Sequence, residues 1–261
     1  MSSKNYLFLG GPNNGKTTYF TLMARLFQDE ANKTKVFRFK FSDDAAASFV
    51  EECIGRIVKQ KWPKKTEMNA QVRYQFQLVK HRWFWNSETT ISYSDFPGEL
   101  CESATENELE GLLRKPAEGN LDERLRDFLV QFRDANGLFF VVDAERMFNE
   151  AERDADDRVF KRLFCAAKGK RIAIIFSKVD LFFGVEALQN KERLVEIFRK
   201  TYANAYAHLP LGRCEFFPVK AFSELAIPDD GRDPIPPKDL KYDKSLLSPV
   251  YWMMKMKGSI Q

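Results

Sequence analysis

Apolar runs alternate with helix-like patterns along most of the chain, from residue 5 to about residue 220. The run Tyr6–Leu9 is continuously apolar, as expected of a strand that is buried on both faces. A helical stripe with the spacing i, i+3, i+4, i+7 and i+8 follows a glycine-containing turn, at Tyr19, Leu22, Met23, Leu26 and Phe27. Strands that alternate with helices predict an α/β fold with a mostly parallel sheet.

The same patterns predict the remaining elements. Strands are expected at 36–41, 72–79, 89–94, 137–143, 171–176 and 214–219, and helices at 43–60, 121–132, 153–167, 185–208 and 246–256. Residues 72–79 alternate with period two and would pair with 89–94 as an antiparallel hairpin that turns near Asn86–Ser87. The proline-rich stretch 228–237 is unsuited to a central strand or helix. We therefore expect a main domain over 1–227, and a connection and helix over 228–261 that pack on it.

Composition excludes several classes of protein. The 261 residues include 41 basic and 37 acidic ones, and this net charge of +4 is too small to indicate a nucleic-acid-binding surface. The hydrophobic share of 44% indicates a folded globular chain rather than a disordered one. No window is long and apolar enough for a transmembrane segment, and the first residues do not resemble a secretion signal. We expect a cytoplasmic protein.

Cysteines and histidines offer no catalytic or metal site. The four cysteines lie roughly fifty residues apart and lack the C-x-x-C spacing of zinc and redox sites. Only two histidines are present, His81 and His208, and neither adjoins a Ser-rich or Cys-rich turn, which argues against a Ser-His-Asp or Cys-His hydrolase.

A phosphate-binding motif lies between the first strand and the first helix. It matches G-x-x-x-x-G-K-[ST], in which glycines let backbone N–H groups converge on phosphate oxygens at a helix N-terminus. Lys16 would contact the β- and γ-phosphates from the surface of the empty site, and the Thr17 hydroxyl would bind Mg²⁺. The predicted nucleotide-binding residues are Gly10, Gly11, Pro12, Asn13, Asn14, Gly15, Lys16, Thr17 and Thr18.

A second motif, Asp95-Phe-Pro-Gly98, comes where the strand 89–94 ends. Asp95 would hold Mg²⁺ through water, and the Gly98 N–H would contact the γ-phosphate, so the pair would sense the third phosphate. A third motif, Ser177-Lys178-Val179-Asp180, ends the apolar strand 171–176.

Together these motifs resemble the Ras-like P-loop GTPases, whose fourth motif is [NT]-K-x-D. The resemblance implies a three-layer G domain with one antiparallel strand, GTP or GDP as ligand, and an effector or activating protein as partner. It also implies that Asp180 accepts both guanine donors and that the Lys178 stem lies along the base, while Ser177 departs from the usual Asn or Thr. Lys220 lies in a loose form of the fifth motif, which contacts the base.

The layout looks most like the bacterial double-GTPase group. The features that carry this likeness are the motifs N-N-G-K-T-T, W-P-x-x-T and D-F-P-G-E and a C-terminal helix with Trp252. A nucleotide-dependent dimer is a further expectation. The switch I threonine, which would bind Mg²⁺ and the γ-phosphate, is Thr66, with Thr34 as the alternative. The separation of Thr17 from Asp95 exceeds that of small Ras-like domains, and we assign the extra length to an insertion at about 35–60.

One departure bears on mechanism. Ras-like enzymes that hydrolyse GTP well carry Gln after D-x-x-G, whereas this chain has Glu99, which adds negative charge near the γ-phosphate. We therefore expect a Mg²⁺-dependent GTP-binding switch that hydrolyses GTP slowly, with Lys16, Thr66, Gly98 and Glu99 as the catalytic group. The alternatives are a non-hydrolysing nucleotide-dependent interaction module and a P-loop ATPase.

Overall fold

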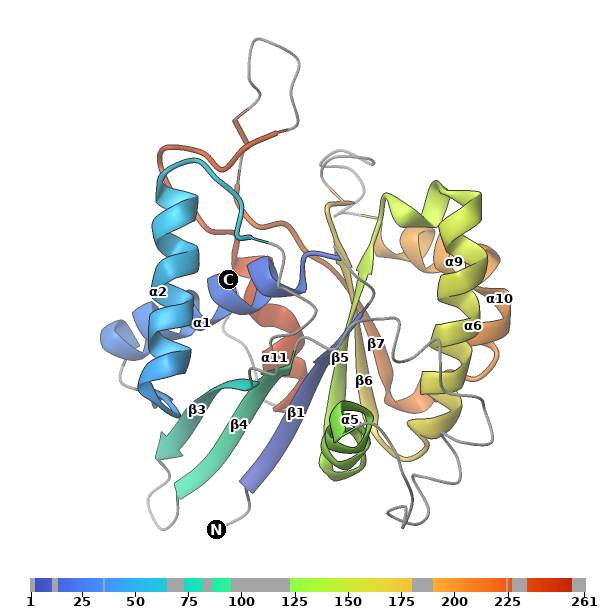
Figure 1. Cartoon of the computed structure of the whole chain (residues 1–261), viewed down its shortest axis with the longest axis horizontal. Coiled ribbons are helices and arrows are strands. Elements are labelled where there is room, and N and C mark those ends of the chain that lie inside the picture. Colours follow the sequence, from blue (N-terminus) through green and yellow to red (C-terminus); the bar gives the residue numbers. More distant parts are fainter. Residues whose placement is uncertain are drawn as a thin grey trace.

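The computed structural model of the chain describes residues 3–10, 14–34, 36–64, 73–81, 86–94, 123–179, 190–223, 225–226 and 234–254. Over these residues a seven-stranded sheet forms the centre of the molecule, with the order β2-β3-β4-β1-β5-β6-β7 (Figure 1). Its strands are β1 (Ser3–Leu9), β2 (Phe37–Phe41), β3 (Arg73–His81), β4 (Asn86–Ser94), β5 (Gly137–Asp143), β6 (Arg171–Ser177) and β7 (Cys214–Pro218).

One strand runs against all the others. β3 is antiparallel to both of its neighbours, β2 and β4, and the remaining adjacent strands pair in parallel. This arrangement confirms the expected mostly parallel sheet with one antiparallel strand. β2 and the helix after it, α2 (Asp44–Val58), lie within the stretch 35–60, and β2 forms one edge of the sheet.

Helices cover both faces of the sheet, which confirms the three-layer α/β architecture (Figure 1). One face carries α1 (Lys16–Thr34), α2, the 3₁₀ turn η3 (Lys244–Leu247) and α11 (Ser248–Met253). The other carries α5 (Glu123–Asp134), α6 (Glu150–Ala166), α9 (Lys191–Thr201) and α10 (Ala203–Tyr206). Short 3₁₀ turns, η1 (Arg146–Phe148) and η2 (Leu211–Arg213), follow β5 and precede β7.

The central strands are apolar because neither of their faces meets water. All seven residues of β5 are buried. In β1, Tyr6 and Phe8 face the helices α1 and α11, while Leu7 and Leu9 face the opposite layer. Phe8 is fully buried, and its ring stacks on Phe139 of β5 with a centroid distance of 4.7 Å. Burying a side chain of this size stabilises the fold by about 1.5–3 kcal/mol.

Helix α2 begins where a capping residue predicts it. The Asp43 carboxylate accepts a hydrogen bond from the Ala46 N–H at 2.8 Å, which satisfies one of the donors that a helix leaves unpaired in its first turn. The expectation of a helix that starts at Asp43 is thus confirmed.

Two predicted boundaries are wrong. β3 continues to His81, which pairs with Asn86, so Asn86–Ser87 belong to strand β4 and not to a turn. Asn and Ser are common turn residues, so the sequence pattern predicted a turn where backbone pairing forms the end of a strand. Of the helix expected at 185–208, residues 185–189 lie outside the described part. Helix α9 begins at Lys191 after the Asn190 cap, and the backbone leaves the helical region at Tyr202.

The C-terminal segment packs back on the first strand and first helix. Tyr6 donates a hydrogen bond to the Met253 carbonyl at 3.1 Å, and Tyr19 donates one to the Leu246 carbonyl at 2.7 Å. The helix expected at 246–256 is in fact a 3₁₀ turn followed by α11, which ends at Met253; Pro249 lies at the start of α11, where a proline is favoured. In the described part of the chain, no helix has the length and apolarity needed to cross a bilayer.

Candidate functional site

The phosphate-binding motif joins the carboxyl end of β1 to the N-terminus of α1. Gly10 has φ +145°, and a Cβ at this position would lie 2.4 Å from the Val141 carbonyl oxygen of β5. Gly15 has φ +76°, in the left-handed region that favours glycine. Its carbonyl accepts the Tyr19 N–H at 2.8 Å, which starts the helix. The two glycines therefore allow the chain to pass close to β5 and then turn into α1.

Lys16 is the first residue of α1 and is only 5% exposed. Its Cδ would lie 3.5 Å from a Cβ at Gly10, so the lysine stem reaches back over the start of the loop. This burial corrects the expectation that Lys16 lies at the protein surface. The reason is that the aliphatic stem reaches back to Gly10 and does not extend into solvent. Thr17 and Thr18 follow in the first turn and are half-buried.

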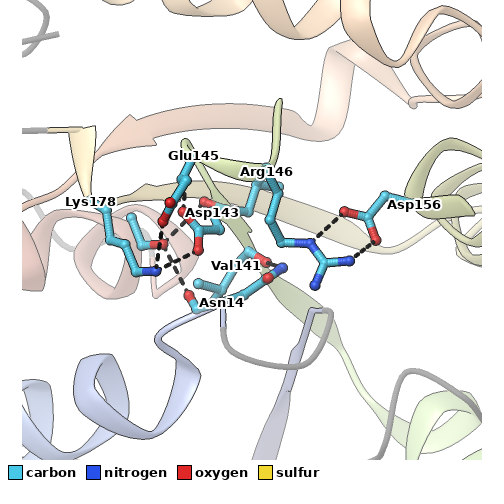
Figure 2. A network of polar contacts seen from close by, with 9 residues as sticks. Asn14, Val141, Asp143, Glu145, Arg146, Asp156 and Lys178 are labelled. Carbon is cyan, nitrogen blue, oxygen red and sulfur yellow. Dashed lines mark hydrogen bonds and ion pairs between the residues drawn. The ribbon is translucent and has the colours of Figure 1, made fainter. Parts of the chain in front are cut away.

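The loop is braced by the ends of two strands (Figure 2). The Asn14 carboxamide donates a hydrogen bond to the Val141 carbonyl of β5 at 3.0 Å. The Ser177 hydroxyl, at the end of β6, lies 3.0 Å from the Asn14 carbonyl and 3.2 Å from that of Val142. Ser177 and Asn14 are both buried, and the side-chain oxygen of Asn14 finds no partner among the described residues. The serine of the S-K-x-D motif thus contacts the phosphate loop.

Lys178 follows with a left-handed backbone, φ +57°. Its Nζ lies 2.7 Å from Asp143 Oδ2, at the end of β5, and 3.6 Å from Glu145 Oε2 (Figure 2). Asp143 is buried and also accepts the Glu145 N–H at 2.9 Å. The motif residues of β1 and β6 therefore meet around β5, which lies between the two strands.

Sequence reasoning missed Asp143. The signal was present, because Asp143 is the single charged residue of a run that is otherwise apolar, Gly137–Asp143. It lies at the carboxyl end of a central parallel strand, where ligands of open α/β sheets bind.

Beside this group lies a second ionic contact that the sequence did not reveal. Arg146 of η1 donates to both oxygens of Asp156 of α6, at 3.0 and 3.1 Å, and both side chains are largely buried. Tyr202 packs nearby: burial, and then the charge of Asp156, raise the pKa of its phenol. This two-point contact fixes η1 against α6, and with it the turn that follows Asp143.

Lys220 lies in the loop after β7, and the C-terminal segment occupies its polar groups. Its N–H donates to Ser245 Oγ at 3.4 Å, and its Nζ lies 3.3 Å from the Ser223 carbonyl and 3.7 Å from Asp243. A contact of Lys220 with the base stays a prediction.

Thr34 does not lie near the phosphate loop. It ends α1, seventeen residues after Thr17, which corresponds to roughly 25 Å along the helix axis. Its hydroxyl donates to the Glu30 carbonyl at 2.9 Å. Thr66, the other switch I candidate, lies outside the described residues, as do Gly11, Pro12, Asn13, Asp95, Gly98, Glu99 and Asp180.

The chain before Thr66 is fixed at Trp62. The indole N–H of Trp62 donates to the Pro234 carbonyl at 2.9 Å, and the Trp62 carbonyl accepts from Arg56 at 3.1 Å. The Trp62 ring also lies 6.1 Å from that of Phe222, in the loop after β7. Trp62 therefore rests on the proline-rich stretch, and the chain beyond Lys64 lies outside the described residues.

The described residues contain no group of three or more His, Cys, Asp or Glu that could hold a metal ion. Of the predicted Mg²⁺ ligands, Thr17 alone is described, and its place in the first turn of α1, next to Lys16, suits a hydroxyl ligand. Hydroxyl and carboxylate oxygens are the hard donors that Mg²⁺ prefers.

This geometry is that of a P-loop nucleotide-binding site. The comparison with family models adds the type: residues 7–116 match the family described as Double-GTPase 1. The match supports a P-loop GTPase of the double-GTPase type, hence a GTP-binding domain, and covers less than half of the chain. Ser177 and Lys178 lie beyond the matched range.

Solved structures also show similarity. The GTPase-like domain of Ski7 from S. cerevisiae, bound to GTP, is 14% identical with a TM-score of 0.42, over 97% of this chain and 50% of that one. Sup35 complexed with GDP is 13% identical with a TM-score of 0.37, over 84% of this chain and 37% of that one. The chain thus spans half or less of these structures. Comparison with curated proteins gives no match.

Proposed function

We propose that the chain is a GTP-binding molecular switch that hydrolyses GTP slowly in the presence of Mg²⁺. The observation that carries the proposal is the hydrogen bond from the Ser177 hydroxyl to the Asn14 carbonyl. This bond brings the S-K-x-D motif into contact with the phosphate loop at the carboxyl ends of the central strands. In the alternative, an ATPase, the S-K-x-D motif would be a surface loop without a role in binding. Such a loop would not need a buried contact with the phosphate loop.

The residues divide by the part of the nucleotide that they would contact. Backbone N–H groups of the phosphate loop and Lys16 would hold the phosphates, at the N-terminus of α1. Lys178 and Asp180 would hold the base. Mg²⁺, held by Thr17, Asp95 and Thr66, would neutralise charge on the phosphate oxygens when bound.

The γ-phosphate would be sensed by Thr66 and Gly98, whose loops would order around it and loosen with GDP. Glu99 would follow Gly98 where a water-orienting glutamine is usual, so intrinsic turnover would be slower than the roughly one turnover per hour of a Ras-type enzyme that carries the glutamine. An activating protein would then set the rate in the cell. A reducing, cytoplasmic location is supported by Cys53, Cys165 and Cys214, none of which forms a disulfide in the described part of the chain.

Nucleotide binding by Asp180→Asn tests the guanine assignment. Calorimetry with GDP, XDP and ADP should show that the parent protein prefers GDP, and that the variant prefers XDP by about tenfold or more, since xanthine replaces a donor with an acceptor that the Asn amide can satisfy. Glu51→Gln, which neutralises an exposed carboxylate of α2, is the matched control. ADP binding as tight as GDP binding in the parent protein would favour the ATPase.

Single-turnover phosphate release from GTP tests hydrolysis. A slow release that requires Mg²⁺ and disappears in Lys16→Ala supports the switch. Tight GTP binding with no release over many hours would instead favour the non-hydrolysing interaction module.

A further inference from the structure

Asp143 is a buried carboxylate whose two oxygens have different partners. It is 2% exposed and ends β5, and the residue beside it in the parallel register is Ser177 of β6. Oδ1 accepts the Glu145 N–H at 2.9 Å, and Oδ2 lies 2.7 Å from Lys178 Nζ. A charged group at this depth is stable only when it is paired, so the contact with Lys178 is a requirement of the site.

The lysine crosses from one strand end to the next. Lys178 starts at the end of β6, and its left-handed backbone is one that L side chains rarely adopt. Its ammonium ends at Asp143 on β5, one strand away. The four methylene groups of the stem therefore span the carboxyl ends of the two strands, beside the phosphate loop (Figure 2).

A second carboxylate, that of Glu145, lies farther from the same lysine and is exposed. Glu145 Oε2 lies 3.6 Å from Lys178 Nζ, and the Glu145 side chain is 60% exposed. Solvent screens such a contact, and exposed ion pairs contribute little. Asp143 is thus the group that fixes the ammonium.

We propose that Asp143 is a positioning residue for the nucleotide base, because it anchors the Lys178 ammonium and so holds the lysine stem as a flat apolar shelf on which the base rests. The inference rests on the proposed function and adds to it a residue that acts through Lys178. A fixed shelf lowers the ordering cost of binding, whereas an unanchored lysine would have to be immobilised each time a nucleotide binds.

A double-mutant cycle on GDP affinity tests the proposal. Asp143→Asn keeps an oxygen for the Glu145 N–H but removes the charge, and Lys178→Met keeps an unbranched apolar stem without the ammonium. We expect each single variant to bind GDP about tenfold more weakly, and the double variant to bind no more weakly than Lys178→Met alone. Glu145→Gln is the matched control and should stay within about twofold of the parent protein.

The cycle shows whether Asp143 acts through Lys178. If Asp143 acts independently of Lys178, its replacement would weaken GDP binding by the same factor whether or not Lys178 is present, which would overturn the proposal. A GDP affinity for Asp143→Asn within twofold of the parent would also overturn it. If Asp143→Asn does not fold, Asp143→Ser takes its place in the cycle, since it is smaller, neutral and also offers an oxygen.

The binding measurements distinguish failure of the proposed function from failure of this inference. A parent protein that binds neither GDP nor GTP would overturn both the function and this inference, whereas a parent that binds GDP with additive single variants would overturn the inference alone. Circular dichroism of each variant at the titration temperature establishes that the protein is folded.

Discussion

Replacement of Ser177 by alanine would remove the contact between the S-K-x-D motif and the phosphate loop. Two carbonyl oxygens lie within reach of the Ser177 hydroxyl, that of Asn14 at 3.0 Å and that of Val142 at 3.2 Å. Because the hydroxyl has a single proton, the substitution removes the equivalent of one donated hydrogen bond. The site is buried, and Ser177 is 8% exposed. Water therefore replaces the lost donor poorly.

The magnitude follows from that burial. A neutral buried hydrogen bond contributes about 0.5–1.5 kcal/mol net, which corresponds to roughly a twofold to tenfold change in an equilibrium constant. Part of this free energy would be lost from folding stability. The rest would be lost from nucleotide affinity, because a loop that is no longer braced must be ordered when the phosphates bind. Because only part of this free energy is lost from binding, we expect GDP and GTP to bind more weakly by at most about tenfold, and by the same factor for both.

Isothermal calorimetry with GDP and with inosine diphosphate is the assay. Inosine diphosphate lacks only the exocyclic amine of guanine, so the ratio of the two affinities reports on the base contact and not on the phosphate loop. Ser177→Ala should leave this ratio unchanged, and Ser177→Thr should keep the affinities close to those of the parent protein. Ser42→Ala is the control, since it removes a buried hydroxyl that has no partner among the described residues.

Two results would refute the reasoning. A change of more than about twofold in the GDP to inosine diphosphate ratio would place the Ser177 hydroxyl at the base. Unchanged affinity together with an unchanged melting temperature would mean that the hydroxyl braces nothing.

Three further predictions concern the phosphates. Gly10→Ala should lower the melting temperature and abolish GDP binding in a fluorescence titration, because its Cβ would lie 2.4 Å from the Val141 oxygen at φ +145°; Gly55→Ala, with nothing within 4 Å, should be neutral or stabilise by about 0.5–1 kcal/mol. Lys16→Ala should abolish GTP binding in calorimetry and also lower the melting temperature, since the side chain is buried; an unchanged GTP affinity would refute the phosphate contact. Glu99→Gln should raise single-turnover hydrolysis about tenfold by removing a charge that opposes the γ-phosphate, and a large fall would instead make the carboxylate a catalytic group.

The strands and helices could be predicted because their burial follows simple periods. β5 is buried on both faces and reads as one apolar run, and α1 shows its buried stripe at helical spacing. The break at Tyr202 had no such signal. It depends on Asp157, which accepts the Ala205 N–H at 2.8 Å and the Asn204 amide at 2.7 Å, and so fixes α10 as a separate turn.

The site was predictable as motifs but not as contacts. Ser177 and Asn14 are 163 residues apart, and only the order of β1, β5 and β6 brings them together. For the same reason Asp143 could not be paired with Lys178 from the sequence, because a carboxylate at a strand end has no periodicity to mark it. The burial of Lys16 could not be predicted, because the motif identifies a lysine at this position but does not show how its aliphatic stem packs.

The contacts of the C-terminal segment bear on how the chain folds as it is synthesised. Tyr6 and Met253 are 247 residues apart, and Leu246 and Val250 complete the same apolar layer as Phe8. While only the first half of the protein has left the ribosome, that layer lacks its cover, so β1 and α1 would expose apolar surface until η3 and α11 emerge. Such long-range contacts slow folding, and a fragment that stops near residue 227 should aggregate or require a chaperone.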